Sequence, residues 1–212
     1  MTAVLVAAGA AVEVVAWRLV ATGRGTVWTV MTVAMSLLGA GALVAGVVMT
    51  SAVPLPVSAA AGVTSGVGLF AATRAFVAIV RGGWRSFGRD ASSLYGARGA
   101  LPLWTAILLG AVLLVTGEEL FWRGFVQARL AEADGRALGA LASLGAFVGV
   151  NVASANLAVI AAAVVGGAVW TVLAYWTGGA LASLLSHSVW TALMLAFPAV
   201  SPGAAPAIDS AA

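Results

Sequence analysis

The sequence contains no cysteine and no lysine, and only 8% of its 212 residues are charged. The missing cysteine excludes a disulfide-stabilised scaffold. The scarcity of charge excludes an ordinary water-soluble domain, in which about a quarter of the residues are charged. Ten arginines against seven acidic residues give a net charge of +3. The arginines are spread between apolar runs and do not form the dense basic face of a nucleic-acid-binding protein, so we expect no nucleic-acid partner.

Hydrophobic residues make up 62% of the chain, and the mean hydropathy is +1.09. About 20 consecutive apolar residues suffice to span a bilayer. Two stretches, 25–73 and 137–208, contain no aspartate, glutamate, lysine or arginine. The first has room for two spans and the second for three. The sequence therefore predicts an all-α fold, a polytopic bundle of transmembrane helices in contact with the lipid bilayer.

We expect about seven spans, with six and eight as the alternatives. Prolines and small polar residues favour turns, which places a turn at Pro54 and Pro56 and breaks near Asn151–Asn156 and Trp176–Gly179. The expected spans lie at about residues 2–22, at two places within 25–73, at about 101–128 and at three places within 137–208. The first span lacks the basic leader and cleavage site of a signal peptide, and we expect it to be retained.

The segment 81–100 is rich in glycine, serine and arginine. Short arginine-bearing loops remain in the cytoplasm, so this segment is expected to be a basic cytoplasmic loop, with the N-terminus outside and the C-terminus inside. It divides an N-terminal three-span region, residues 1–100, from a four-span core, residues 101–200. The small polar tail 201–212 is expected to be disordered.

Three charges interrupt the apolar run of the fourth span: Glu118, Glu119 and Arg123. On a helix Glu119 and Arg123 are neighbours four residues apart and can pair. Glu118 points about 100° away, so the same arginine cannot serve it equally well. One paired and one free carboxylate suit a division between a structural and a chemical role. The alternative is that all three are solvated charges at the helix end.

The polar residues His187, Asn151 and Thr191 also lie in apolar runs. A lone histidine in a span is often only a hydrogen-bonded packing residue. Its occurrence with a glutamate pair and an asparagine in other spans favours one shared polar pocket, because ionisable groups inside a bilayer are costly and mark functional sites. With one histidine and no cysteine, the set lacks the two or three histidines common at catalytic zinc. We therefore expect neither a metal nor a cofactor.

These residues carry a family resemblance. The pattern Glu118-Glu119-x-x-x-Arg123 resembles the first motif of the CPBP family, the intramembrane CAAX proteases and bacteriocin-processing enzymes also called the Abi family. The segment Tyr175-Trp176-Thr177-Gly178-Gly179, which leads to His187, is similar to the approach to the third motif of that family. The order and spacing match over about residues 101–197.

Two positions differ from the family pattern. Asn151 follows Phe147 where the second motif has histidine, and Thr191 follows His187 where the third motif has asparagine. The resemblance implies that Glu118 activates the water, that Asn151 positions it, and that His187 with Thr191 stabilises the oxyanion. Asparagine can hydrogen-bond a water but cannot accept its proton.

The resemblance implies a glutamate-type intramembrane endopeptidase. It would hydrolyse a peptide bond near a membrane-embedded terminus of a membrane-associated peptide or protein, in peptide maturation, sorting-tag removal or self-immunity. The alternative is a weak or inactive pseudoprotease that binds the transmembrane helix of a partner, and a third hypothesis is a small transporter or proton relay. A lysine-free composition rich in alanine, glycine, valine and arginine is typical of high-GC bacterial genomes, which points to a bacterial inner or plasma membrane.

Three further charged residues receive structural interpretations. Glu13 and Arg18, in the first span, are expected near the membrane interface, with polar packing contacts as the alternative. Arg74, near the end of the third span, is expected to be a snorkelling anchor. Most of the eight tryptophans lie near predicted span ends, which is typical of an interfacial belt.

Overall fold

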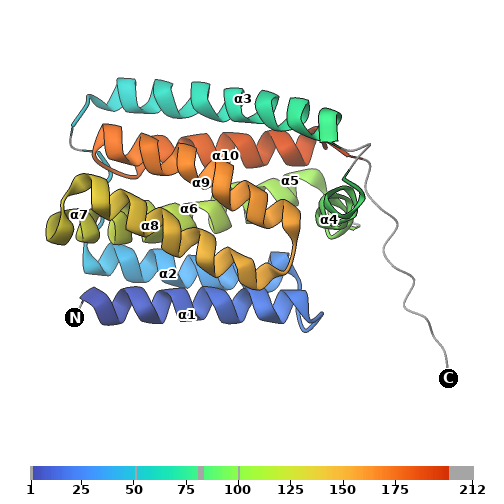
Figure 1. The fold of residues 1–212 in the computed structure, drawn as a ribbon, viewed down its shortest axis with the longest axis horizontal. Helices are drawn as coiled ribbons and strands as arrows, with labels where there is room; N and C mark the ends of the chain where they lie inside the picture. The colour runs from blue at the N-terminus through green and yellow to red at the C-terminus, as the bar shows by residue number, and fades with distance from the viewer. Residues whose placement is uncertain (1, 51, 81–83, 100, 201–212) are drawn as a thin grey trace.

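The computed structural model describes residues 2–50, 52–80, 84–99 and 101–200, and these residues form helices and turns without a strand. Six of the helices are long and apolar enough to cross a membrane. The predicted all-α, polytopic helical bundle is confirmed (Figure 1). The protein is therefore a multi-pass membrane protein.

The bounds of the helices follow the predicted spans. The first three are α1 (Thr2–Ala21), η1 (Val27–Met31) continued by α2 (Thr32–Ala45), and α3 (Leu55–Val80). The fourth is one continuous helix made of α5 (Leu103–Ala106), η2 (Ile107–Leu114), α6 (Val115–Glu119), η3 (Leu120–Gln127) and α7 (Ala128–Asp134). The remaining spans are α8 (Arg136–Asn151) with the short η4 (Val152–Ser154), α9 (Leu157–Thr177) and α10 (Leu181–Ala196).

The seventh apolar helix, α10, is shorter than the others. Its 16 residues extend about 24 Å at the usual helical rise, less than the roughly 30 Å hydrocarbon core. The expected seven spans thus correspond to six full-length helices and one shorter helix among the described residues.

Both breaks predicted in the C-terminal stretch are present. After η4, Ala155 adopts a left-handed backbone conformation, and the side chain of Asn156 accepts hydrogen bonds from the first amides of α9. At the other end of α9, Gly178 has φ 72°, the left-handed geometry with which glycine commonly ends a helix. The two turns reverse the chain, so that α8, α9 and α10 run antiparallel in succession.

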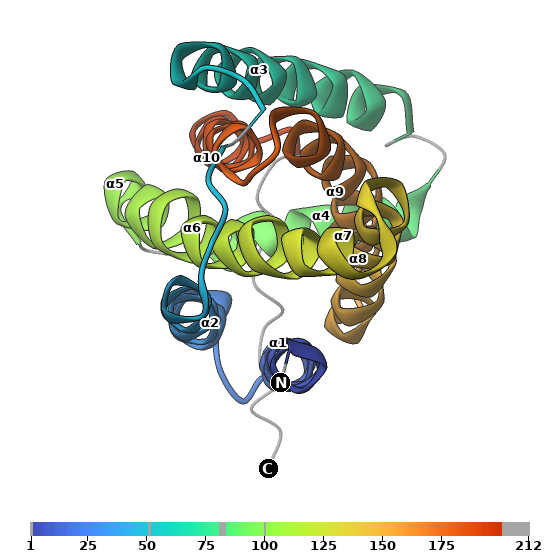
Figure 2. The same cartoon turned by 90° about the vertical axis from the view of Figure 1, so that its left-hand side faces the viewer.

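The fourth span lies in the middle of the molecule. Figures 1 and 2 show the segment from α5 to α7 crossing the bundle between α1 and α2 on one side and α10 and α3 on the other. The N-terminal helices α1 and α2 therefore lie on one side of the fourth span, whereas α10 covers its other side and α3 packs on α10. The predicted boundary between residues 1–100 and the core 101–200 stays a prediction, and the helices on its two sides pack directly against each other.

The segment 81–100 is not simply a loop, because it contains the helix α4 (Arg85–Gly96). The prediction rested on its glycine and serine content, but Phe87 and Ala91 share one helical face and are buried against Val77. The side chain of Asp90 accepts a hydrogen bond from the Leu157 amide at the start of α9. The tertiary contacts of this apolar face stabilise the helix. Residues 81–83 and 100 lie outside the described residues, as does the expected disordered tail 201–212.

The helix α4 lies across the end of the bundle where α1 ends and α2 begins (Figure 1). The indole nitrogen of Trp28 donates to the carbonyl of Ala97, 2.7 Å away, which joins the first interhelical connection to this region. The two arginine-bearing segments therefore lie at the same end, as expected from the even number of crossings between them.

Arg74 has a more specific place than an interfacial anchor. The third span continues beyond it to Val80, and its guanidinium donates to the carbonyls of Phe197 and Pro198, which follow α10. A cation near the last carbonyls of a helix is favourable because it satisfies groups that have no intrahelical partner. Arg18 is exposed in the last turn of α1, in keeping with its predicted interfacial position.

Backbone contact between α2 and α6 depends on glycine. A Cβ at Gly117 would collide with the carbonyl of Met35, and a Cβ at Gly39 would lie 2.6 Å from the Cα of Gly117. In membranes, small residues at such positions allow helices to approach closely and to pack. This contact fixes the height and rotation of the helical turn that carries Glu118.

We expect Gly117→Ala to lower the melting temperature of the purified protein in detergent, because the two helix backbones must separate to admit the methyl group. The control is Gly145→Ala, since a Cβ at Gly145 meets nothing within 4 Å. Overpacking of this kind typically costs about 1–3 kcal/mol. Equal melting temperatures for the two variants would show that the contact does not constrain the fold.

Candidate active site

One face of the fourth span carries a buried charge network centred on Glu119. Its Oε1 accepts a hydrogen bond from Arg123 Nη1 at 3.1 Å and lies 3.0 Å from His187 Nδ1. Glu119 has no exposed surface, and Arg123 retains 2% of its exposure. The predicted Glu119–Arg123 pair is therefore present, and the structure adds His187 of α10 as a second partner of the same carboxylate.

Aromatic rings surround this network. The imidazole of His187 stacks on Trp170 of α9, with ring centroids 3.5 Å apart and planes inclined by 16°. The Arg123 guanidinium lies 4.2 Å from the centroid of the Phe147 ring and donates to the carbonyl of Gly167 at 3.3 Å. The rings hold both side chains in place and exclude water from around the carboxylate, which strengthens its charged hydrogen bonds.

The adjacent face of the same helix carries Glu118. It is buried, with 7% of its surface exposed, and it makes no hydrogen bond or ion pair with another described residue. It nevertheless lies within electrostatic range of His187, Glu13, Glu119 and Arg123. The structure thus provides one carboxylate held by two basic side chains and a second, next to it in the sequence, without a direct partner.

Glu13 of α1 joins the site on the Glu118 side. Its Oε2 accepts a hydrogen bond from the indole nitrogen of Trp122 at 2.7 Å. Trp122 follows Glu118 by four residues, so the two lie on the same helical face. Glu13 is 1% exposed, and the prediction that it lies near the membrane interface is wrong.

The sequence contained a signal for Glu13 that the interfacial interpretation missed. Glu13 lies near the middle of α1, which extends from Thr2 to Ala21 and is otherwise apolar except for Arg18 in its last turn. A carboxylate at such a depth marks a functional site by default. Only the packing of α1 against its neighbours shows which polar partners it meets.

Asn151 lies at the end of α8 and connects to the same carboxylate. Its side-chain nitrogen donates to the carbonyl of Phe147 at 2.9 Å and to Glu13 Oε1 at 3.4 Å. Asn151 is buried. Asn151, at the second-motif position, therefore joins the polar cluster by its hydrogen bond to Glu13. It makes no direct hydrogen bond to Glu118.

Thr191 is the one predicted site residue that remains apart. It is half-buried on α10, its methyl carbon lies 3.9 Å from where a Cβ of Gly110 would be, and its hydroxyl makes no hydrogen bond to another described residue. The structure thus brings five predicted residues into one buried cluster with Glu13, whereas Thr191 stays outside its hydrogen bonds. These five are Glu118, Glu119, Arg123, Asn151 and His187.

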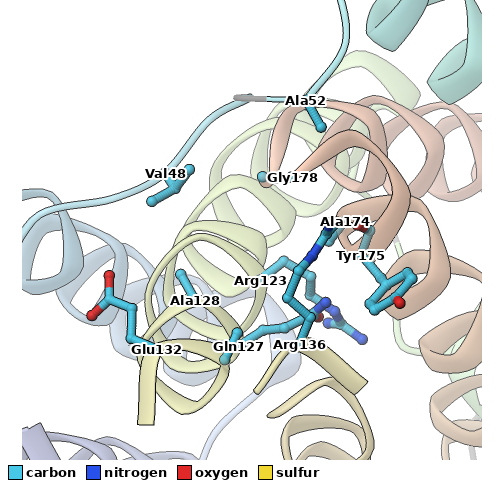
Figure 3. Close-up of a pocket in the computed structure, with 12 residues that line it drawn as sticks. Val48, Ala52, Arg123, Gln127, Ala128, Glu132, Arg136, Ala174, Tyr175 and Gly178 are labelled. Carbon is cyan, nitrogen blue, oxygen red and sulfur yellow. Dashed lines mark hydrogen bonds between the residues drawn. The ribbon is translucent and has the colours of Figure 1, made fainter. Parts of the chain in front are cut away.

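A pocket of about 280 Å³ leads to this cluster from one end of the bundle. Figure 3 shows Arg123, Gln127 and Arg136 gathered in its middle, with Ala174 and Tyr175 of α9 beside them. Gln127 is anchored by a hydrogen bond from its amide nitrogen to the carbonyl of Thr171. The pocket therefore extends from the end of α7 and α9 to the guanidinium that neutralises Glu119.

The arrangement combines the elements of acid–base chemistry. Glu118 offers an unpaired carboxylate, and His187, held through Nδ1, keeps its second ring nitrogen for another partner. Glu119 and the stacked Trp170 hold the imidazole, and neither makes a hydrogen bond to Glu118. Among the described residues, no three histidine, aspartate or glutamate side chains converge as metal ligands.

The two glutamates are expected to respond differently to substitution. Glu119→Ala and Arg123→Ala should each lower the unfolding free energy by about 3–5 kcal/mol, because removal of one partner leaves a buried charge uncompensated. Glu118→Gln should leave the melting temperature nearly unchanged, since no direct partner is lost. Thermal unfolding in detergent, monitored by tryptophan fluorescence, measures all three variants. Equal destabilisation would contradict the different roles of Glu118 and Glu119.

Comparison with known proteins concerns the same region of the chain. The family model described as type II CAAX prenyl endopeptidase Rce1-like matches residues 100–193. No curated protein and no solved structure matches the chain. The match covers every residue of the buried cluster except Glu13, which lies in α1. Residues 100–193 therefore match the Rce1-like type II CAAX prenyl endopeptidases, a membrane protease family of the CPBP group.

Proposed function

We propose that the protein is a glutamate-type intramembrane endopeptidase in which Glu118 activates the attacking water. The observation that carries this proposal is the contrast between neighbouring carboxylates. Glu119 is engaged by Arg123 and His187, whereas Glu118 is buried without a direct partner among the described residues. A general base must keep an oxygen free for the proton it accepts, and Glu118 is the motif carboxylate that does so.

In the proposed reaction Glu118 takes a proton from water as the water oxygen attacks the carbonyl carbon of the scissile peptide bond. The carbonyl oxygen gains the electron pair and becomes an oxyanion. Collapse of this intermediate breaks the carbon–nitrogen bond, and the proton held by Glu118 passes to the departing amine. One general acid–base group of this kind contributes about 10²–10⁴-fold to the rate.

His187 is the proposed oxyanion donor. Its Nδ1 is occupied by Glu119 and its ring is held by Trp170, so the other ring nitrogen, when protonated, donates in a fixed direction. Preorganised donors of this kind are worth about 2.7–4 kcal/mol in the transition state. Thr191, the family-derived second donor, stays a prediction, because it requires a rotamer or substrate that brings its hydroxyl to the site.

Membership in a membrane protease family implies a membrane-associated substrate. We propose a peptide or protein cleaved near a membrane-embedded terminus, whose polar end approaches through the pocket beside Arg123 (Figure 3). Peptide maturation, sorting-tag removal and self-immunity are the proposed roles. The arginines around α4 favour a cytoplasmic position for the α4 end of the bundle by the positive-inside rule. The pocket lies at the opposite end, beside the ends of α7 and α9 (Figure 1). The composition favours a bacterial inner or plasma membrane.

One observation favours a second candidate, a pseudoprotease that binds the transmembrane helix of a partner. Asn151 occupies the second-motif position, and its amide nitrogen is already engaged by Phe147 and Glu13. An amide cannot accept the proton of the water. If catalysis requires a basic side chain at this position, the protein can bind a substrate at the site but cannot cleave it.

The test uses the purified full chain in liposomes. The substrates are a prenylated peptide with a CAAX terminus, the substrate class for which the matched family is named, and unprenylated peptides that end in a hydrophobic helix. Fragments are identified by mass spectrometry. We expect cleavage of at least one peptide by the wild type and a loss of at least about 100-fold in Glu118→Gln. The matched control is Asp134→Asn, which changes an exposed carboxylate at the end of α7 and should leave the rate unchanged.

Two outcomes would contradict the protease. Full activity in Glu118→Gln would remove the proposed base. Tight binding of a peptide without cleavage, by the wild type and by Asn151→His alike, would support the pseudoprotease.

A further inference from the structure

We infer that Glu13, which lies outside the matched protease domain, is a positioning residue that decides which atom Asn151 presents to the site. The catalytic consequence of this inference rests on the proposed function. The orientation of the Asn151 amide does not, because it can be measured without a substrate. The carboxylate of α1, together with the Phe147 carbonyl, holds the Asn151 amide nitrogen, so that the amide oxygen remains as the free acceptor. That acceptor takes the place of the basic nitrogen that histidine supplies in the family motif.

The hydrogen bonds of Asn151 fix the orientation of its amide. The amide nitrogen has two hydrogens, and its two partners are both acceptors, the carbonyl oxygen of Phe147 at 2.9 Å and Glu13 Oε1 at 3.4 Å. The reversed amide would face these oxygens with its own oxygen and lose both hydrogen bonds. The network therefore selects one orientation, in which Oδ1 accepts no hydrogen bond from a described residue.

Glu13 is itself held firmly. Its Oε2 receives the Trp122 indole hydrogen bond at 2.7 Å, and its side chain is almost completely buried. It forms no salt bridge with a described residue. A carboxylate at this depth without a cation in contact is costly, so a role in the site explains it better than a contribution to stability.

The Glu13–Asn151 contact lies on the Glu118 side of the fourth span. Trp122 follows Glu118 by one helical turn on the same face, and Glu13 and Glu118 lie within electrostatic range of each other. The other charged and titratable groups near them are Arg123, Glu119 and His187. An acceptor on Asn151 beside this face can receive the second hydrogen of a water whose first hydrogen points to Glu118. A donor at the same place would compete with the water for Glu118.

The orientation can be measured without a substrate, because the chain contains only two asparagines, Asn151 and Asn156. Selective ¹⁵N-asparagine labelling therefore gives two pairs of side-chain amide signals in detergent. Glu13→Gln preserves volume but replaces a carboxylate oxygen by an amide, so it should shift the Asn151 pair. The Asn156 pair, held at α4 by the Asp90 carbonyl, is the internal reference and should not move.

The matched substitution is Glu132→Gln, which changes an exposed glutamate paired with Arg129. It should move neither pair of signals. An Asn151 pair that is identical in the wild type and in Glu13→Gln would overturn the inference, whatever the activity.

The catalytic consequence is tested by a double-mutant cycle on the cleaved peptide. Glu13→Gln should lower kcat by about 10- to 100-fold, with little change in KM, because the water loses its orientation. In the Asn151→His background the same substitution should change kcat by no more than about twofold, so the cycle should report strong coupling between the two positions. An imidazole keeps one basic nitrogen in either tautomer, so it can still offer an acceptor when Glu13 is replaced.

The cycle separates positioning from packing, since a purely structural loss at Glu13 would persist in the Asn151→His background. Equal losses in the two backgrounds would therefore overturn the positioning role. If the wild type and Asn151→His cleave no peptide, the proposed function fails and the catalytic role of Glu13 fails with it. The amide signals still decide whether Glu13 orients Asn151.

Discussion

The site depends on one carboxylate, Glu119, which is held by two basic partners where water is excluded. Its Oε1 contacts both Arg123 of the same helix and His187 of α10. A buried charge of this kind is tolerable only when it is paired, so the fold must bring α10 to the fourth span at this height. The stacking of His187 on Trp170 and of Arg123 over Phe147 then places α8 and α9 around the same point.

That pairing also separates the roles of adjacent residues. Because successive helical residues point about 100° apart, Glu119 faces Arg123 and His187, whereas Glu118 lies on the adjacent face with Trp122 and near Glu13. The first face carries both contacts of the Glu119 carboxylate. The second face contains Glu118, Trp122 and the Glu13–Asn151 contact, where hydrogen-bonding capacity remains for a substrate or a water.

The matched domain is incomplete as a physical site without the N-terminal helices. Gly117 lies against the backbone of α2, which fixes the turn that carries Glu118. Glu13 of α1 engages both Trp122 and Asn151. Helices outside residues 100–193 therefore contribute side chains and backbone contacts to the buried cluster of the matched region.

The sequence by itself determined the helical membrane fold, the breaks near Asn151–Asn156 and Gly178, and the pairing of Glu119 with Arg123, because hydropathy, turn residues and four-residue spacing are local properties. Only the tertiary structure decided the partners of Glu13 and His187 and the isolation of Thr191, since these depend on how helices far apart in the sequence rotate against one another. The same reason explains α4, whose apolar face has meaning only against Val77. Local pattern identifies which groups are buried, and packing decides which of them meet.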